Sequence, residues 1–409
     1  MSVGVCIINK NGIALAADSA STVGENKMFY NSMNKVYNLS FNNKIGVITY
    51  GATVICNTPI EIILKEYRKF IDENYKGIPD FFSIIETFEK FLCEKSLYFK
   101  FKQSEEKFCS ELIQLLTKEW GEKINKNVQN INSDKEEEKI TEIIEQLKNY
   151  MDTCSIVPGY DVSDYIKTNY GEHIINTIKS FCPVLVEHEN QYDLFFQYIC
   201  KYFNLSLQIE AKQSLGLLFA GYDSQSAFPK CTHIQIHNFV GGKLKYIIEE
   251  KIEESMNSSF IIPLAQPDVI NTFIKGFSDN YMNAIPDLIK SEINKRMSLI
   301  VGDKTEIQKN FEDIQNTIVS TLLNKSREEY INPLLNSLHA LQIPDLASLA
   351  ESLVNITSLK RKFSMDGYQQ TVGGPTDVAT ISSNDGFIWI KRKHYFDKEL
   401  NPHFIQKYK

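Results

Sequence analysis

The sequence predicts an α+β protein with mostly antiparallel sheets and helices segregated outside them. Short apolar runs fill residues 3–50, return at 215–249 and return again at 378–392. Between these blocks lie two long stretches in which apolar residues recur at helical spacing. Because helices come in two blocks and do not alternate with single strands, this order disfavours a doubly wound parallel sheet.

Four strands are expected at the N-terminus. Apolar runs at 3–8 and 13–17 flank an Asn-Lys-Asn-Gly turn, which is typical of a hairpin. A second pair of runs lies at 35–39 and 45–50, and Gly51 ends the last of them.

The later elements follow in blocks. Pro59 precedes a run of apolar residues at helical spacing, a position where a helix tolerates proline. Ser133-x-x-Glu136 has the form of a capping box at a helix start. Strands are expected at 215–220, 232–237, 243–249, 378–382 and 387–392, and helices at 267–362.

Composition is that of an ordinary globular protein, with 43% hydrophobic and 23% charged residues. The net charge of −7 implies no phosphate-binding surface, so we expect no nucleic-acid partner. The eight cysteines form no C-x-x-C pair, which excludes a zinc ribbon and a thioredoxin-type motif. We expect them to be reduced thiols.

Targeting signals are not expected in this sequence. Asn9, Lys10 and Asn11 interrupt the first apolar run, whereas a secretory signal needs an unbroken one. No stretch reaches the roughly 18 apolar residues of a membrane span. We therefore expect a cytoplasmic protein without membrane contact, unprocessed except at Met1.

Four residues near strand ends form a candidate catalytic group: Ser2, Asp18, Lys35 and Gly51. Removal of Met1 would give Ser2 a free α-amine with a reference pKa near 8, so that one residue carries both nucleophile and base. A nearby Lys35 would lower the pKa of that amine, and Asp18 would hold Lys35 in place. The Gly51 N–H would face a developing oxyanion.

Each of these residues also has an ordinary explanation. Many chains begin with Met-Ser, Asp18 can simply end a strand, and most lysines lie at the surface. None of the four is specific by itself.

Their joint spacing resembles the proteasome β-subunit family of N-terminal nucleophile (Ntn) hydrolases. The stretch "GIALAADSASTVG" is similar to that family's signature. The resemblance implies a four-layer αββα sandwich. It puts the family's N-terminal threonine on Ser2, its aspartate on Asp18, its lysine on Lys35 and its oxyanion glycine on Gly51.

The resemblance continues in "LGLLFAGYDS" and in "TVGGPTDVATISSNDGFIWI". In the family, a loop before the last strand pair carries a serine and an aspartate near the catalytic amine. Here the serine position falls on Val372, and the aspartate position falls on Gln369, or on Asp366 with a local insertion. The family's serine after its seventh strand has no clear match around Ala265 and Gln266.

The chain is much longer than the family requires, so we expect large helical insertions. The predicted αββα core comprises 2–56, 214–275 and 346–409. A helical insertion is expected at 57–213 and a second helical extension at 276–345. The insertions would form a lid or a partner-binding arm beside the candidate site.

A second candidate group lies in the predicted strand at 232–237. His233 and His237 share a face there with Cys231 and Gln235. Metal binding is one interpretation, and a solvent-facing strand surface is the one we favour. The sequence has no H-E-x-x-H, Walker loop or G-x-G-x-x-G, and we expect no cofactor and no metal.

The leading hypothesis is an N-terminal serine hydrolase, a peptidase that cleaves amide bonds through an acyl-enzyme on Ser2. Its partners would be a peptide or protein substrate and further copies in a homo-oligomer. Two alternatives stay open at this point. One is a non-catalytic proteasome-like scaffold or binding protein, and the other is an amidohydrolase of small molecules.

Overall fold

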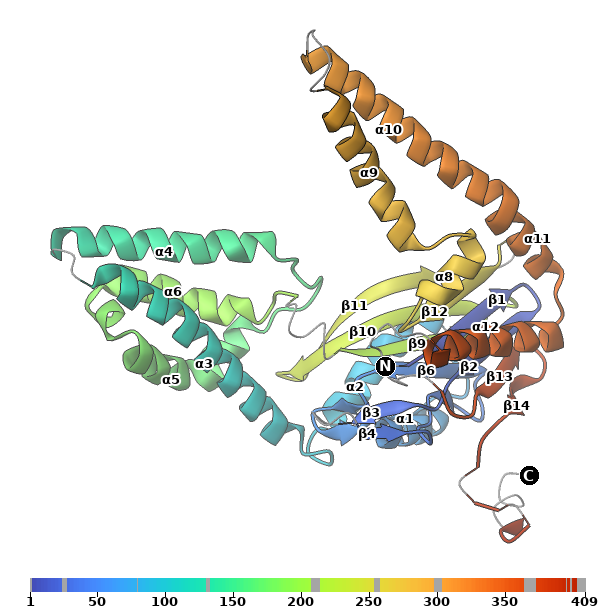
Figure 1. Cartoon of the computed structure of the whole chain (residues 1–409). Helices are drawn as coiled ribbons and strands as arrows, with labels where there is room; N and C mark the ends of the chain where they lie inside the picture. The colour runs from blue at the N-terminus through green and yellow to red at the C-terminus, as the bar shows by residue number, and fades with distance from the viewer. Residues whose placement is uncertain are drawn as a thin grey trace.

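The structure is a computed structural model, shown in Figure 1. It describes residues 2–402 apart from 24–27, 79, 130–132, 207–213, 254–257, 298–303, 364–372, 395 and 398. No helix in these described parts is long and apolar enough to cross a membrane.

Two five-stranded antiparallel sheets form the centre of the molecule. The first sheet has the order β12 (Phe260–Leu264), β1 (Gly4–Asn9), β2 (Gly12–Ala17), β13 (Asp377–Ser382), β14 (Gly386–Lys391). The second sheet has the order β11 (Lys243–Ile252), β10 (Lys230–Val240), β9 (Leu215–Gly221), β6 (Ile45–Gly51), β5 (Val36–Asn38). Two short pairs lie beside them: β3 (Ser21–Val23) with β4 (Met28–Tyr30), and β7 (Val54–Ile55) with β8 (Thr58–Pro59).

The two sheets face each other across a shared apolar core. Alternate residues of a strand point to opposite faces, so Cys6 and Ile8 of β1 join this core while Val5 and Ile7 point away from it. The second sheet contributes Ile48 among others. The hydrophobic pattern thus fixes which face of each strand is inside.

Helices cover the outer faces of both sheets (Figure 1). The outer face of the first sheet packs on α8 (Asp268–Lys275), α11 (Asn332–Ala340) and α12 (Ile343–Phe363). The outer face of the second sheet packs on α1 (Ile60–Asn74), the 3-10 turn η1 (Phe81–Ser83) and α2 (Ile84–Glu94). The predicted α+β class is confirmed.

Two helical parts stand away from the sheets in Figure 1. The helical unit comprises α3 (Phe101–Val128), α4 (Ser133–Thr153), α5 (Ser163–Phe181), the 3-10 turn η2 (Pro183–Glu187) and α6 (Glu189–Tyr202). It has its own apolar core. The arm comprises α9 (Asp279–Met297) and α10 (Lys304–Ser326), which leads through the π-helical turn η3 (Arg327–Ile331) into α11.

One buried carboxylate ties the helical unit to the second sheet. Glu105 of α3 is 7% exposed and accepts hydrogen bonds from the hydroxyls of Tyr165 and Tyr170, at 2.5 and 3.0 Å. Its other oxygen accepts the Gly241 N–H, in the turn between β10 and β11, at 2.9 Å. One side chain thus bonds to both α5 and the sheet.

The strand prediction was wrong for residues 260–264, where none was expected. Pro263 has no N–H to donate, and a proline inside an apolar run argues against a strand. Within the described residues β12 is an edge strand whose one partner is β1, and an edge strand tolerates proline. The short pair β3–β4 was also missed.

Candidate active site

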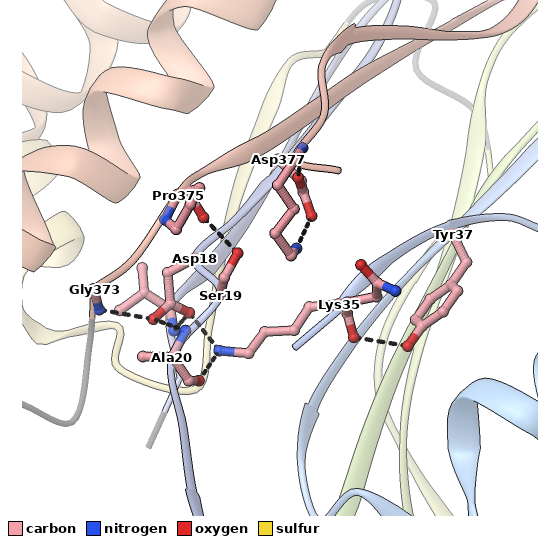
Figure 2. Close-up of polar contacts among 11 residues, drawn as sticks. Asp18, Ser19, Ala20, Lys35, Tyr37, Gly373, Pro375 and Asp377 are labelled. Atoms are coloured by element: carbon pink, nitrogen blue, oxygen red, sulfur yellow. Dashed lines mark hydrogen bonds and ion pairs between the residues drawn. The ribbon is translucent and has the colours of Figure 1, made fainter. Parts of the chain in front are cut away.

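Asp18 is the centre of the candidate site. It follows β2 and is 1% exposed, and Figure 2 shows the contacts that converge on it. One carboxylate oxygen accepts from Lys35 Nζ at 2.5 Å and from the Val3 N–H at 2.9 Å. The other accepts the N–H groups of Ala20 and Gly373, at 3.3 and 3.0 Å. These donors hold the carboxylate in a single orientation.

Lys35 enters the site from the opposite sheet. It immediately precedes β5, and its side chain is 5% exposed. Besides Asp18, the ammonium donates to the Ala20 carbonyl at 2.5 Å (Figure 2). Burial lowers the pKa of Lys35 from its ordinary value, although the charge of Asp18 opposes this. Lys35 therefore gives up a proton more readily than a lysine in water.

Two backbone hydrogen bonds of Val3, the residue after Ser2, hold Ser2 beside Asp18. The Val3 N–H donates to the Asp18 side chain, and the Asp18 N–H donates to the Val3 carbonyl at 3.0 Å. This pair of bonds fixes the chain next to Ser2, which is 8% exposed. Ser2 lines a small cavity of about 40 Å³ together with Lys35, Thr49 and Gly51.

Gly51 lies at the end of β6 in a conformation that needs glycine. Its φ is +78°, and a Cβ there would lie 2.4 Å from the carbonyl oxygen of Ser214. A side chain is therefore excluded by both strain and contact. The backbone at this corner of the cavity stays bare, so a ligand can approach it closely.

The four residues predicted from the sequence therefore meet at one place. Ser2, Lys35 and Gly51 line the same cavity, and Asp18 binds Lys35 directly. Their positions suit a serine nucleophile, a buried cation and a backbone donor, and their catalytic roles stay a prediction.

The loop before β13, which the resemblance had placed near the site, makes backbone contacts there that the sequence did not specify. The Ser19 hydroxyl donates to the Pro375 carbonyl at 2.5 Å, and the Ser19 N–H donates to the Gly373 carbonyl at 3.2 Å (Figure 2). Gly373 and Pro375 belong to the "VGGP" stretch. Its two glycines were the one sequence feature that could have indicated a close backbone approach here. Asp366, Gln369 and Val372 lie outside the described residues.

A second buried ion pair lies near the first. Asp377, at the start of β13, is 2% exposed and binds both Lys393 Nζ and the Lys393 N–H. Both charges act on the pKa of Lys35, in opposite directions. Sequence analysis missed this pair, because nothing local predicts contact between residues on either side of β14.

His233 is not solvent-facing, so the favoured prediction for this strand was wrong. It is 8% exposed and hydrogen-bonds through Nε2 to the Tyr50 hydroxyl at 2.7 Å. Burial lowers the pKa of His233 to about 4 and raises that of Tyr50 to about 12, so both are neutral at pH 7. The face of β10 that carries His233 and Cys231 points into the core between the two sheets. Among the described residues no three His, Cys, Asp or Glu side chains gather as a metal site.

Comparison with known proteins gives matches only among solved structures. No protein-family model and no curated protein matches the chain. Anbu (ancestral beta-subunit) from Yersinia bercovieri is 10% identical, with a TM-score of 0.30, over 99% of this chain and 90% of that one. The helical assembly of the Anbu complex from Pseudomonas aeruginosa is 9% identical, with a TM-score of 0.28, over 99% of this chain and 92% of that one.

These comparisons correct the family read from the sequence. Both of these structures are ancestral beta-subunits, a different family from the proteasome β-subunits, and no family model or curated protein supports the latter. Assignment of the chain to the proteasome β-subunit family was therefore wrong.

Proposed function

We propose that the chain is an N-terminal serine hydrolase, a peptidase whose nucleophile is Ser2 after removal of Met1. The observation that carries the proposal is the Asp18 carboxylate, which binds Lys35 Nζ and the Val3 N–H with the same oxygen. The buried Asp18 carboxylate thereby fixes the position of the Lys35 ammonium and of Val3, the residue next to the nucleophile.

The chemistry follows from the residues around the cavity. Ser2 Oγ attacks the carbonyl carbon of an amide, and its proton passes to the Ser2 α-amine. The carbonyl electron pair moves to oxygen, which accepts a hydrogen bond from the Gly51 N–H. The C–N bond breaks, the amine leaves with the proton, and an ester on Ser2 remains. Water then attacks the ester with the α-amine as base, releasing the acid and restoring Ser2.

Lys35 has a tuning role in this proposal. Its charge would disfavour protonation of the Ser2 amine and thus keep more of it in the basic form. Asp18 positions Lys35 through the hydrogen bond to its Nζ.

The arrangement of helices and sheets is compatible with the four-layer αββα sandwich of Ntn hydrolases. The proposal keeps the predicted division into that core, at 2–56, 214–275 and 346–409, and helical insertions at 57–213 and 276–345, with one change: α1 and α2 cover the second sheet and so supply a helical layer of the core. It also places the protein in the cytoplasm. Self-association into a homo-oligomer is a further part of it, which analytical ultracentrifugation would test.

Covalent labelling of the purified protein tests the proposed nucleophile. Intact-mass analysis should show a chain that begins at Ser2. An electrophile that traps N-terminal nucleophiles should add once, at Ser2, and Ser2→Ala should abolish the addition. Ser320→Ala changes an exposed serine of α10 and is the matched control. A retained Met1, an acetylated Ser2 or full hydrolysis by Ser2→Ala would each contradict the mechanism.

The same labelling separates the alternatives. A non-catalytic binding protein leaves Ser2 unlabelled. Cleavage of small amides but not of peptides would show an amidohydrolase of small molecules in place of a peptidase.

A further inference from the structure

A second and much larger cavity, of about 600 Å³, lies next to the candidate site. Its volume is in the range of ligand-binding pockets, which run from about 300 to 1,000 Å³. It is bordered by β5 and β14, each an edge strand of its sheet in the described structure. Asn34 lines this cavity as well as the small cavity of Ser2, so the two cavities are neighbours on either side of one residue.

The charge of this cavity is opposite to that of the chain. The whole protein has a net charge of −7, yet the cavity is lined by four cationic side chains and a single carboxylate, Glu61. That carboxylate is bound by Lys65 at 2.7 Å, and Lys393 is bound by Asp377. Arg68 and Arg392 add two guanidinium groups, which suit bidentate binding of carboxylates.

Aromatic side chains lie directly beside the two arginines. Arg68 lies over the Phe41 ring, at 4.5 Å from its centre, and Arg392 lies over Trp389 at 4.7 Å. Trp389 is half-buried and packs edge-to-face on Phe387. Each cation is therefore coupled to an apolar surface, which suits a ligand that carries acidic and apolar groups side by side.

The edges around the cavity favour a peptide over a phosphate compound. An edge strand offers backbone N–H and C=O groups that an extended chain can pair with. Asn31, Asn34 and Asn38 add side-chain amides to the lining, which both donate and accept. The cavity lining contains no glycine among its described residues, unlike a phosphate-cradling loop.

We propose that this cavity binds an acidic, aromatic-containing segment of the peptide substrate, with carboxylates on Arg68 and Arg392 and an apolar side chain against Trp389. That the segment belongs to a substrate rests on the proposed function. Asn34 connects the bound segment to the nucleophile site, because it directly precedes Lys35 and donates to Glu61 of the cavity at 3.0 Å.

Intrinsic fluorescence tests the binding without any turnover. The chain has two tryptophans, and Trp120 lies in the helical unit. In the double variant Ser2→Ala/Trp120→Phe, the emission therefore reports on Trp389 alone. The probe is a short peptide that alternates glutamate and phenylalanine. Its lysine–phenylalanine counterpart and pyrophosphate are the competing probes.

The acidic peptide should change the Trp389 emission saturably, and the lysine peptide should not. Arg68→Gln and Arg392→Gln should each weaken binding by roughly tenfold or more, because each removes a charged hydrogen-bond donor. Arg→Lys at either position should recover part of it. Arg327→Gln, at an exposed arginine of η3, is the matched control and should leave binding unchanged.

Equal binding of both peptides, or unchanged affinity in both arginine variants, would overturn the inference. Displacement of the acidic peptide by an equal concentration of pyrophosphate would overturn the peptide as occupant. Because the nucleophile is absent from this background, failure of Ser2 labelling in the parent chain overturns the hydrolase alone. Charge-selective binding would in that case still support an acidic-peptide site.

Discussion

Lys35 and Asp18 form an ion pair from which water is almost excluded, whereas the ion pairs Lys107–Glu111 and Lys126–Glu122 of the helical unit lie at its surface. A surface pair contributes about 0–1 kcal/mol to stability, because water screens it. A buried pair must offset the cost of removing two charges from water and is weak evidence for stability. These two pairs of the helical unit keep their charges in water, where they cost little, whereas the pair at the strand ends bears the cost of removing both charges from water.

The largest effect is expected from breaking the buried pair on one side. Lys35→Met should lower the free energy of unfolding by about 3–5 kcal/mol, because it leaves the buried Asp18 carboxylate without its cation. Urea unfolding followed by circular dichroism measures this. The matched change Lys126→Met, in an exposed pair of α3, should cost under about 1 kcal/mol. Equal losses in both variants would remove the contrast between the two regions.

Acid should destabilise the sheets through His233. Its pKa is about 4 in the folded chain, below the ordinary 6.5, so the unfolded chain binds the proton first as the pH falls. Stability should therefore fall between pH 6.5 and pH 4, by up to about 3 kcal/mol from this group. His233→Gln should flatten that fall in urea unfolding measured across the window. His188→Gln, in the helical unit, is the matched control, and the same flattening there would refute the assignment to His233.

Two glycines with left-handed backbone, Gly51 and Gly159, allow the sheets and the helical unit to be compared without any change of charge. Gly51→Ala should lower stability by about 2–3 kcal/mol, since a left-handed φ and a clash with the Ser214 carbonyl act together. Gly159, between α4 and α5 of the helical unit, has a similar φ of +73°, but a Cβ added there would have no neighbour within 4 Å. Gly159→Ala should therefore cost only about 1 kcal/mol, which is the strain alone. Thermal unfolding of the two variants gives the difference, and a larger loss at Gly159 would contradict it.

The smallest of these effects concerns Glu105, the buried carboxylate that joins the helical unit to the second sheet. Glu105→Gln keeps the size of the side chain but weakens its charged hydrogen bonds to two tyrosines and to Gly241, and should cost about 1–2 kcal/mol. Hydrogen exchange should show reduced protection of the backbone amides at the β10–β11 turn and in α5. An equal loss of protection throughout the chain would contradict a local connection between the helical unit and the sheet.

The sequence made the first hairpin predictable, because it depends on short-range turn chemistry and strand pairing. The meeting of Ser2, Asp18 and Lys35 was expected from their joint spacing and its resemblance to a known family, because Lys35 and Asp18 meet across two different sheets. It did not indicate Gly373 as a donor to Asp18, since 355 positions separate the two. Nor did it indicate β12, because a proline, Pro263, disfavours a strand there and its partner β1 lies far away at the start of the chain. Contacts between residues far apart in the chain leave no pattern in the local sequence from which they could be predicted.

The bond from Glu105 to Gly241 has a mechanical meaning. The turn at Gly241 ends β10, and the same strand holds His233 against Tyr50, which lines the cavity of Ser2. A series of contacts therefore runs from Glu105 through the turn at Gly241 and along β10 to His233 and Tyr50. A force applied to the helical unit would act on a strand that contacts a wall residue of the candidate site.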